Sequence, residues 1–462
     1  MPAITSNSLT GNAYIDGVLG NYKWATNGLT YSFPTDGSYY GGSYGADENI
    51  TNFGVLNPAQ QATARNILKM FSSVANLSFA KIDETATQHA DLRFALSDKP
   101  GTAWAYLPST AAEGGDIWFS GSSGYYTSPV KGGYAYEVFL HEIGHALGLE
   151  HPHESGMPAD RDSMEYTVMS YRSYVGASTT SGFVNESWGY AQSLMMYDMA
   201  ALQHMYGANY TTNSGNTTYK WNPTTGEMMV NGVGQGAPGG NKILLTVWDG
   251  GGSDTYDFSN YTSNLKVDLR PGQWTTTSAA QLAKLHYDGS KVAAGNIANA
   301  LLYKGDVRSL IENAIGGSGS DSLTGNDAAN SLIGGGGTDT LYGWGGNDTL
   351  DGGTGADALF GGSGADVFNF NSVGDALPGA QDTIQDFVPG SDHIDLRTID
   401  ANTMAAGDQA FSFISAESFT GQVGQLNFTN NVLSGDVNGD KVGDFRIHVP
   451  GVSMLALMDL YL

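Results

Sequence analysis

Apolar residues recur at helical spacing in three stretches of the first two hundred residues. Asn57 fits an N-cap and Pro58 the first helical position, and the apolar residues that follow fall on one helical face. These residues are Ile67, Met70, Phe71 and Val74. Further helices are predicted from Tyr134 to Leu149 and from Tyr190 to Tyr206, where a stripe of Met and Leu is typical of a core-facing surface.

Strand-like stretches lie between these helices. ADLRFALS alternates Leu92, Phe94 and Leu96 with other residues, which predicts a half-buried strand. TAWAYLPS and GDIWFSG are further strand candidates. We therefore predict a mixed α+β domain over residues 1–207.

From residue 208 onward the chain is rich in Gly, Asp, Asn and Thr, interrupted by short apolar segments, and an internal repeat appears. Six nonapeptides run without a gap from Gly316 to Asn369. Their sixth residues are Asp321, Asn330, Asp339, Asp348, Asp357 and Asp366. Their eighth residues are Leu323, Leu332, Leu341, Leu350, Leu359 and Phe368. A flexible glycine-rich linker would not keep this register through every copy.

Each position of the repeat has a physical role in a parallel β-roll. Glycines permit tight turns with inward-facing carbonyls, the sixth residue adds a hard oxygen ligand, and the eighth fills the core. Two nonapeptides make one coil, with Ca²⁺ held between turns on the same side. An outlying copy, DGGGSDTYDF from Asp249, extends the calcium-binding region toward the N-terminus. We predict an all-β parallel β-roll (RTX) domain over residues 208–462.

The charge of the chain is compatible with many bound cations. The formal net charge is −26 and the sequence pI is about 4.4. Such acidity argues against nucleic acid as a partner and against an anionic membrane surface. Without Ca²⁺ the carboxylates of the roll repel one another, so we expect the C-terminal half to fold only with calcium.

The lack of cysteine limits the possible metal sites, and the lack of a visible signal sequence bears on location. The chain has no cysteine, so disulfides and thiolate zinc sites are excluded, and a transition metal has to be held by His and carboxylate. The first residues show no Sec-type signal, and no apolar run is long enough for a membrane span. Taken alone, these last two features predict a cytoplasmic protein.

The segment LHEIGHALGLEHP, from Leu140 to Pro152, carries the most specific chemical pattern. HExxH on a helix places His141 and His145 on one face, at ligand distance from a single ion. Glu142 lies beside that ion, where it can take a proton from a metal-bound water. The alternative is a polar helix whose histidines make ordinary structural hydrogen bonds.

The motif extends to HExxHxxGxxH, which supplies a third ligand. Gly148 can adopt the left-handed conformation that ends the helix and turns the chain back, and His151 can then reach the metal. Three neutral imidazoles suit Zn²⁺ with an open fourth position, as in a catalytic site. His153 could also ligate, but it follows the third ligand so closely that we assign it to the surface or a loop.

Downstream, SMEYTVMSYRS contains Met169 and Tyr171. Met169 can be an ordinary core methionine. The functional alternative is the methionine turn that forms the floor of the zinc site in metzincins, followed by a tyrosine that faces the metal.

Together these motifs resemble the serralysin family, the secreted RTX metzincin metalloproteases of bacteria. The resemblance covers most of the chain and includes DTIQDFVPGSDHIDL and GDVNGDKVGDF near its end. It implies an extracellular zinc endopeptidase with His141, His145 and His151 as zinc ligands. Glu142 would be the general base that activates the zinc-bound water. Tyr171 would be an ancillary zinc ligand that moves off to stabilise the oxyanion.

The resemblance also implies where the substrate lies. AWAYLP, Ala103 to Pro108, resembles the edge strand along which an extended protein or peptide substrate lies antiparallel.

For calcium, the resemblance implies ligand sets that pair each turn with the next turn but one. The first two sets are Gly317, Gly319 and Asp321 with Gly334, Gly336 and Asp339, and Asn326, Ala328 and Asn330 with Gly343, Gly345 and Asp348. The other two are Gly335, Gly337 and Asp339 with Gly352, Thr354 and Asp357, and Trp344, Gly346 and Asp348 with Gly361, Ser363 and Asp366. Further residues of this chain resemble calcium positions of the family: Asp249, Gly251, Gly252, Asp254 and Glu312.

The resemblance changes the predicted location. Family members leave the cell through a type I (ABC) exporter that recognises an uncleaved C-terminal signal, and this chain ends DLYL, Asp459 to Leu462, close to the family pattern. Low calcium inside the cell would keep the roll unfolded for transport. We therefore expect a secreted, extracellular monomer whose partners are protein substrates and the exporter.

Two other functions are consistent with parts of the sequence. A calcium-binding RTX adhesin or surface-layer protein would use the repeats alone and bind no zinc. A lipase would need the GxSxG match in GGSYG, Gly41 to Gly45, although no apolar strand precedes it. A weaker calcium pattern, DVNGDKVGD, has Asp436, Asn438, Asp440 and Asp444 at EF-hand-like spacing but lacks the loop's glycine and final glutamate.

Overall fold

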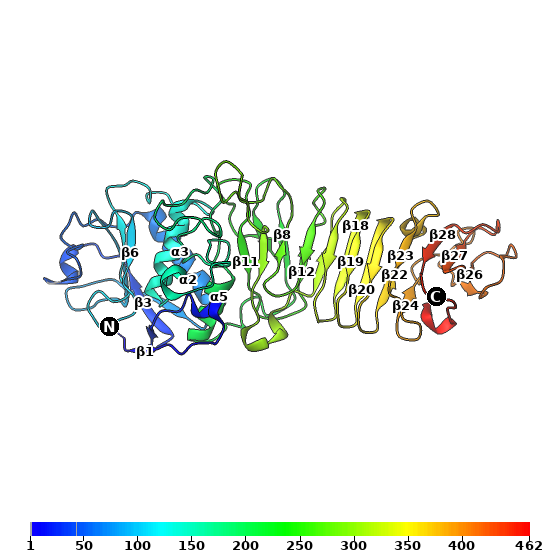
Figure 1. Cartoon of the computed structure of the whole chain (residues 1–462), viewed down its shortest axis with the longest axis horizontal. Helices are drawn as coiled ribbons and strands as arrows, with labels where there is room; N and C mark the ends of the chain where they lie inside the picture. Colours follow the sequence, from blue (N-terminus) through cyan, green and yellow to red (C-terminus); the bar gives the residue numbers. More distant parts are fainter. Residues whose placement is uncertain (1, 43) are drawn as a thin grey trace.

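The computed structural model describes residues 2–42 and 44–462 and shows an elongated molecule (Figure 1). The α-helices of the described residues all lie in the first part of the chain, and stacked strands make up the rest. The helices are α1 (Ala13–Asp16), α2 (Pro58–Val74), α3 (Tyr134–Ala146), α4 (Pro152–Ser155) and α5 (Met196–Tyr206). Short 3-10 helices are η1 (Gly37–Tyr40), η2 (Tyr303–Gly305), η3 (Val307–Ser309), η4 (Val373–Ala376) and η5 (Leu457–Asp459). None of the described helices has the length and apolar character needed to cross a bilayer.

The N-terminal region is built on a five-stranded sheet in the order β4-β3-β5-β7-β6. Its strands are β3 (Gly28–Ser32), β4 (Ser78–Lys81), β5 (Leu92–Ser97), β6 (Ala103–Ala105) and β7 (Ile117–Ser120). β4, β3, β5 and β7 are parallel, and β6 pairs antiparallel with β7 at the edge of the sheet. The predicted edge strand is thus confirmed, although it ends at Ala105. A separate pair consists of β1 (Ile4–Ser6) and β2 (Tyr22–Trp24).

The structure differs from the pattern-based predictions in three places. β5 is not half-buried, because it lies inside the sheet with both faces covered, and Arg93 is buried in an ion pair with Asp116 (Nη2 to Oδ2, 2.7 Å). The last helix begins at Met196, because the preceding Tyr190 and Gln192 direct their N–H groups to carbonyls of other segments. The histidine helix α3 ends at Ala146, three residues short of the prediction.

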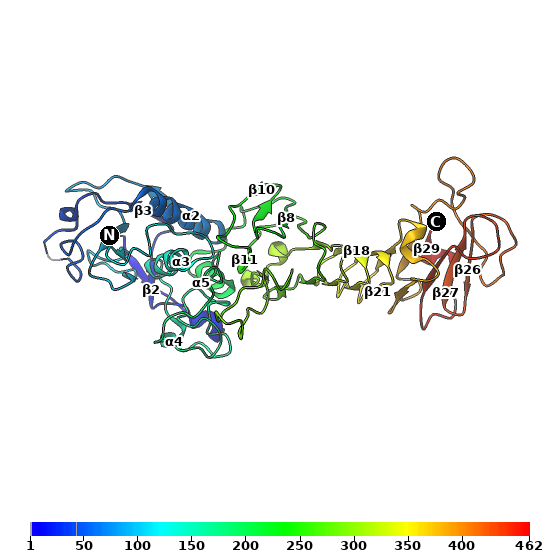
Figure 2. The ribbon, with the colours of Figure 1, turned by 90° about the horizontal axis from the view of Figure 1, so that it is seen from above.

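Two long sheets run along the second part of the molecule and face each other (Figure 2). One has the order β10-β9-β8-β12-β16-β18-β20-β22-β24-β29, with β8 (Thr218–Trp221), β9 (Met228–Val230), β10 (Val233–Gly234), β12 (Thr255–Asp257), β16 (Asn313–Ile315), β18 (Ser331–Gly337), β20 (Thr349–Gly355), β22 (Val367–Asn369), β24 (His393–Asp395) and β29 (Leu460–Tyr461).

The other long sheet has the order β13-β17-β19-β21-β23-β28-β27-β26-β25, with β13 (Lys266–Asp268), β17 (Ser322–Thr324), β19 (Thr340–Tyr342), β21 (Ala358–Phe360), β23 (Asp382–Ile384), β25 (Ser412–Phe413), β26 (Gln425–Thr429), β27 (Val432–Asp436) and β28 (Phe445–His448). A third, short sheet contains β11 (Leu245–Val247), β14 (Trp274–Thr275) and β15 (Ile297–Asn299).

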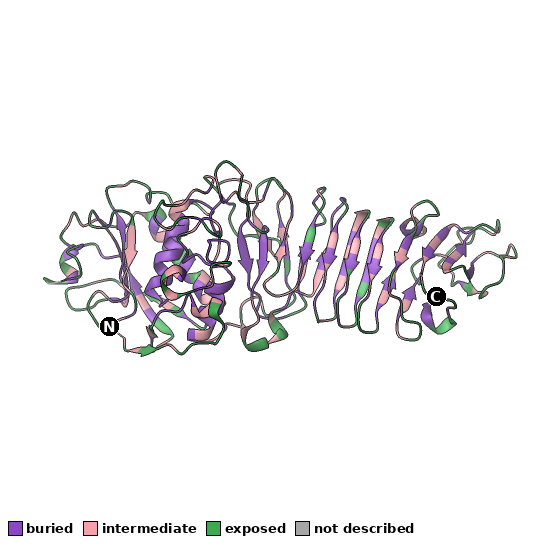
Figure 3. Ribbon diagram, in the orientation of Figure 1, coloured by how far each residue is buried: buried purple, intermediate pink, exposed green. Residues whose placement is uncertain are grey.

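The pairing of these strands confirms one coil for every two nonapeptides. β17 pairs in parallel with β19, and β18 with β20, each time joining a residue to the one two repeats later. The eighth residue of every nonapeptide is fully buried, and Figure 3 shows buried segments recurring from strand to strand along the roll. Burying one such Leu contributes about 1.5–3 kcal/mol, so the column supplies the hydrophobic stabilisation of the roll.

The core of the N-terminal region extends past residue 207. Leu244, Trp248, Leu285 and Ala298 all belong to it, although they follow α5 in the sequence. The column of eighth residues belongs to a second core. The chain between α5 and the nonapeptides therefore packs against both cores and connects them.

The roll core generates the first prediction. Leu341→Ala should lower the free energy of unfolding by about 2–5 kcal/mol, because a fully buried side chain is replaced by a cavity between two sheets. Thr338→Ala, at an exposed position of the same coil, should change it by less than about 0.5 kcal/mol. Urea unfolding followed by circular dichroism at fixed calcium measures both, and equal effects would contradict the assignment of this column as the core.

Candidate metal centre

A tight turn after α3 brings the third histidine back toward the first two. Gly148 has φ +100°, and a side chain there would place Cβ 2.7 Å from the carbonyl oxygen of Tyr22. The Leu149 N–H bonds to the Gly144 carbonyl (2.9 Å), and the Gly20 N–H to the Gly148 carbonyl (2.9 Å). The predicted left-handed turn at Gly148 is confirmed, and both conformation and space require glycine there.

The turn makes the three imidazoles converge through the same atom. The Nε2 atoms of His141 and His145 are 3.1 Å apart, those of His141 and His151 are 3.2 Å apart, and those of His145 and His151 are 2.8 Å apart. Tetrahedral ligands at the usual Zn–N distance would lie about 3.3 Å apart. The donor set and its spacing therefore fit one small cation.

The opposite ring nitrogens show which Nε2 atoms are free to bind. His141 Nδ1 lies 2.8 Å from the Val168 carbonyl, and His145 Nδ1 lies 2.9 Å from the Leu149 carbonyl. A carbonyl accepts only from N–H, so each Nδ1 carries the proton and each Nε2 presents a lone pair. Burial lowers the pKa of His141 to about 3, which keeps its ring neutral. Lone pairs that converge without a donor between them are the arrangement that a metal ion satisfies.

Glu142 lies beside this cluster and is not one of its converging groups. Its carboxyl is buried, and its Oε2 has no hydrogen-bond partner among the described residues. Burial raises the pKa of Glu142 to about 8, opposed by a hydrogen bond from the Ala105 backbone N–H. A carboxyl with this pKa, aimed at a cavity, can take and return a proton near neutral pH.

Met169 and Tyr171 both lie close to the cluster. A Cβ on Gly144 would lie 2.6 Å from the Met169 sulfur, so the fully buried methionine packs directly against the middle of the HExxH helix. The Tyr171 ring lies 4.4 Å from the His151 ring, centroid to centroid, and 5.6 Å from the His141 ring. Both residues thus lie close to the histidine cluster, and their roles at a metal stay predictions.

Sequence reasoning missed Asp198, which holds the methionine turn in place. This buried carboxylate on α5 accepts the Val168 N–H (2.8 Å) and the Thr167 hydroxyl (2.5 Å). The Val168 carbonyl in turn orients His141. The one available signal was an acid inside a stripe of Met and Leu, which by itself does not identify a partner.

His153 lies closer to the cluster than the sequence suggested. Its ring stacks on His151 at 5.4 Å between centroids, and Glu154 lies 3.1 Å from His151 Nδ1 through Oε2. His151, His153 and Glu154 therefore form a second group of potential ligands that shares His151 with the first.

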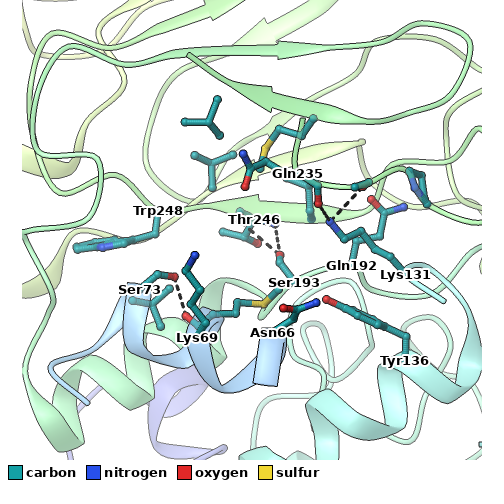
Figure 4. Close-up of a pocket in the computed structure, with 18 of the residues that line it drawn as sticks. Asn66, Lys69, Ser73, Lys131, Tyr136, Gln192, Ser193, Gln235, Thr246 and Trp248 are labelled. Carbon is teal, nitrogen blue, oxygen red and sulfur yellow. Dashed lines mark hydrogen bonds between the residues drawn. The ribbon is translucent and has the colours of Figure 1, made fainter. Parts of the chain in front are cut away.

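A cavity of about 520 Å³ opens beside the histidine cluster and is lined by His141, Glu142, Tyr171 and Ala103 of the edge strand. A larger cavity of about 880 Å³, shown in Figure 4, lies where α2 meets the first strands of the second region. Lys131 closes one side of it by donating to the Gln235 carbonyl (2.6 Å). None of the described residues that line the larger cavity belongs to the histidine cluster, so of these two cavities the smaller one lies at the site.

The acidic residues of the nonapeptides form regular columns along the roll. The Asp321 N–H donates to Asp339 Oδ1 (2.7 Å), Asp339 N–H to Asp357 Oδ1 (2.7 Å), and Asp348 N–H to Asp366 Oδ1 (2.9 Å). The second oxygens of Asp339, Asp348, Asp357 and Asp366 are buried and have no partner among the described residues.

These unpartnered oxygens fit calcium. A Cβ on Gly334 would lie 2.5 Å from both Asp339 Oδ2 and the Gly352 carbonyl oxygen, so oxygens of two turns converge where the glycine leaves space. Ca²⁺ binds such carboxylate and carbonyl oxygens at about 2.3–2.6 Å. Burial raises the pKa of Asp339 and of Asp348 to about 7, as expected for carboxyls placed there without a counter-charge.

Two of the expected sixth-position ligands are satisfied in another way. Asn330 donates through Nδ2 to the Glu312 carbonyl (2.8 Å) and to Asn326 Oδ1 (3.1 Å), so an N–H group occupies the place of the free oxygen. Asp321 accepts the Leu265 and Gly317 N–H groups, one on each oxygen. The Asn330 side chain is therefore engaged in amide hydrogen bonds, and its role as a calcium ligand stays a prediction.

The expected carbonyl ligands are partly engaged as well. The Gly317 carbonyl accepts the Gly336 N–H (3.0 Å), and the Ser363 carbonyl accepts the Gly346 N–H (3.0 Å), which leaves each oxygen one further lone pair. Residues Gly335 to Gly337 pair with Gly353 to Gly355 as continuations of β18 and β20. These segments are thus strand extensions and not the isolated tight turns that the glycines predicted.

The ladder continues beyond the nonapeptides through residues that the repeat search missed. The Asp357 N–H donates to Asp382 Oδ1 (2.8 Å) and the Asp366 N–H to Asp392 Oδ1 (3.1 Å). Asp382 Oδ2 is again buried and unpartnered. The segments DTI and DHI repeat the order of an acid followed two residues later by a buried Ile, but an insertion before them breaks the nine-residue period.

A separate acidic group lies at the start of the second region. Asp249 accepts the Tyr219 hydroxyl (2.6 Å) and the Gly251 N–H (2.7 Å), and Glu312 accepts the Asp254 N–H (2.8 Å). Asp254 Oδ2 is buried without a partner, which fits the expected calcium position there.

Two weaker sequence patterns have different outcomes. In the DVNGDKVGD loop, Asp436 accepts the Gly439 N–H (2.7 Å) and the Lys441 N–H (3.0 Å), and Asp444 accepts the Val437 N–H (2.8 Å). These carboxylates stabilise a turn between β27 and β28 and leave no cation-directed set. The serine of GGSYG, Ser43, lies outside the described residues.

Comparison with known proteins decides the family. Residues 208–460 match the family described as Peptidase M10 serralysin C terminal, and residues 27–214 match Metallo-peptidase family M12. The chain belongs to the serralysin family. Metallopeptidase AprA of Pseudomonas marginalis is 36% identical over 445 residues, covering 92% of this chain and 84% of its own. Serralysin of Proteus mirabilis is 37% identical over 433 residues, covering 88% and 80%.

Membership confirms the resemblance found in the sequence. The chain is a metallopeptidase with an N-terminal metallopeptidase region and a mostly-β serralysin C-terminal region. As a serralysin it places its histidine cluster within the M12 match and its acidic columns within the serralysin C-terminal match.

The carboxylate behind the methionine turn generates the second prediction. Asp198→Asn should weaken metal binding about 10- to 100-fold, because residues that orient a metal-ligating His tune its affinity. Asp83→Asn, on the exposed surface, is the matched control. Chelator competition with a zinc-sensitive dye gives both affinities, and equal values with unchanged circular dichroism would show that Asp198 has no role in orienting His141.

Proposed function

We propose that the chain is an extracellular zinc endopeptidase in which His141, His145 and His151 hold the zinc ion and Glu142 is the general base. The convergence of three Nε2 lone pairs beside a buried, partly unpartnered carboxyl carries this proposal. Zn²⁺ is the metal because three neutral imidazoles without thiolate suit it and leave a coordination position open.

The substrate binds along the edge of the sheet. β6 pairs only with β7 among the described strands, so its outer side can hydrogen bond to an extended peptide. Because Glu142 accepts the Ala105 N–H, the end of this strand lies next to the catalytic carboxyl. A peptide paired antiparallel with β6 therefore passes the histidine cluster with its backbone fixed.

The residues of the chain move the protons of the reaction. Zinc, when bound, supplies a Lewis acid that polarises the scissile carbonyl and acidifies water. Glu142 takes a proton from the attacking water and returns it to the leaving amine, and its buried setting matches its pKa to this exchange. The Tyr171 hydroxyl donates to the oxyanion that forms on the carbonyl.

The names of the relatives support proteolysis over the alternatives. Those relatives are named metallopeptidase and serralysin, and they align over most of the chain, including the histidine helix. An adhesin that used the repeats alone would not need three oriented imidazoles beside a sheet edge.

Calcium and secretion complete the proposal. We assign calcium to the unpartnered oxygens of Asp339, Asp348, Asp357 and Asp366, which would otherwise be buried without a counter-charge. Catalysis then belongs to residues 1–207 and the calcium roll to residues 208–462. A monomer exported by a type I exporter would fold its roll on meeting external calcium.

Replacing the general base tests the chemistry. Glu142→Gln and Glu142→Ala, refolded with calcium beside the wild type, should lose about 10²- to 10⁴-fold in kcat on casein, because the proton acceptor is removed. Glu113→Gln, a nearby acid that does not line the cavity, should retain full activity. Wild-type activity that survived in both Glu142 variants would place the base elsewhere, and an inactive but folded wild type would favour the adhesin.

Removing calcium tests the roll. Chelation should abolish the β-sheet circular dichroism of the second region at neutral pH, because repelling carboxylates remain in its interior. Asp348→Ala should raise the calcium concentration needed for half-refolding by about tenfold, since a ligand charge is lost. Asp327→Ala, an exposed acid of the same repeats, should leave it unchanged. A roll that stayed folded in chelator would contradict the calcium assignment.

A further inference from the structure

The cavity beside the histidine cluster contains a carboxyl that the proposed reaction does not use. Glu137 lies on α3 one turn before His141 and lines the cavity together with His141 and Glu142. Its side chain is 1% exposed, and its Oε1 is buried without a hydrogen-bond partner among the described residues. An acid buried in this way is costly unless something that enters the cavity pairs with it.

The position of the cavity shows which part of a substrate would enter it. Glu142 accepts the N–H of Ala105, at the end of β6, whereas Thr102 and Ala103, at its beginning, line the cavity. A peptide antiparallel to β6 runs in the opposite direction, so residues after the scissile bond lie toward Ala103. The side chain that directly follows the cleaved bond is therefore the one that the cavity receives.

The walls of the cavity suit a long cation. Tyr134, Tyr190 and Phe183 form a group of rings whose centroids are 5.9–6.2 Å apart, and all three line the cavity. Aromatic faces attract ammonium and guanidinium groups and pack against their aliphatic stems. None of the described lining residues is Lys or Arg, so no basic side chain of the cavity wall pairs with Glu137.

We propose that Glu137 is a specificity-determining residue that selects Lys or Arg directly after the scissile bond. The inference rests on the proposed endopeptidase function and adds the substrate class. The entering cation pairs with the unpartnered carboxyl, and the aromatic walls hold its stem, so the ion pair forms only with a bound substrate.

A peptide series with the calcium-refolded, zinc-loaded enzyme tests the inference. Quenched fluorescent peptides would differ only in the residue after the cleaved bond: Lys, Arg, Gln or Met. Wild-type kcat/KM should be at least about tenfold higher for Lys and Arg than for Met. Glu137→Gln should lower the values for Lys and Arg about 10- to 100-fold and leave the Met peptide within about twofold.

Controls separate pocket recognition from general attraction. Glu113→Gln removes one charge outside the cavity and should keep the wild-type preference. The preference should also persist at about 0.5 M salt, where long-range attraction is screened but a buried pair is not. A preference lost in salt would overturn the inference.

The remaining outcomes distinguish this inference from the proposed function. Cleavage with a preference for Met, or an equal loss on all four peptides in Glu137→Gln, would overturn the role of Glu137 and leave the endopeptidase function standing. No cleavage of any peptide by the folded wild type would overturn both. If Glu137→Gln fails to fold, the wild-type ranking still tests the preference for Lys and Arg, and a ranking without it overturns the inference.

Discussion

Buried lone pairs without hydrogen-bond donors are the constraint on which both halves of this chain depend. In the N-terminal region three Nε2 atoms face one another, and in the roll a column of aspartate oxygens faces backbone carbonyls. Both groups are positioned by the same kind of hydrogen bond to the backbone. In His141, His145 and the aspartates one atom is anchored by a backbone group, Nδ1 on a carbonyl or Oδ1 on an N–H, and the other atom is presented to the space where a cation fits. His151 Nδ1 instead lies beside the Glu154 carboxylate.

This arrangement couples folding to the ions. Burial raises the pKa of Asp339 and Asp348, because the charged form is desolvated before a counter-ion arrives. Without calcium the apolar core of the roll has to offset that cost, and bound calcium would remove it. The turn of Asn326 and Asn330 is closed by amide hydrogen bonds, so the two residues hold that coil together with no charge to neutralise.

A shared hydrophobic core links the roll to the catalytic region. The N-terminal core includes Leu244, Trp248 and Ala298, so the segment that leads into the roll also packs behind the methionine turn and α5. His141 and His145 lie on α3, His151 follows the turn after it, and the substrate would lie on the sheet edge across the cavity. Glu142 and Glu137 both line this cavity from α3, and we propose that Glu142 serves the metal position and Glu137 the side chain that follows the cleaved bond.

Short-range spacing is what the sequence by itself determined. HExxHxxGxxH predicted the histidine cluster, because residues four apart lie on one face of a helix. The left-handed conformation of Gly148 then returns the chain, and with it His151, toward that face. The nonapeptides predicted the coil, because a fixed nine-residue period places equivalent residues at equivalent positions of successive turns. The roles of Asp198, Glu137 and Asp382 were decided only by the tertiary structure. Their partners lie on other elements or beyond an insertion, and no periodicity encodes which distant backbone group a buried acid will meet, or whether it will meet none.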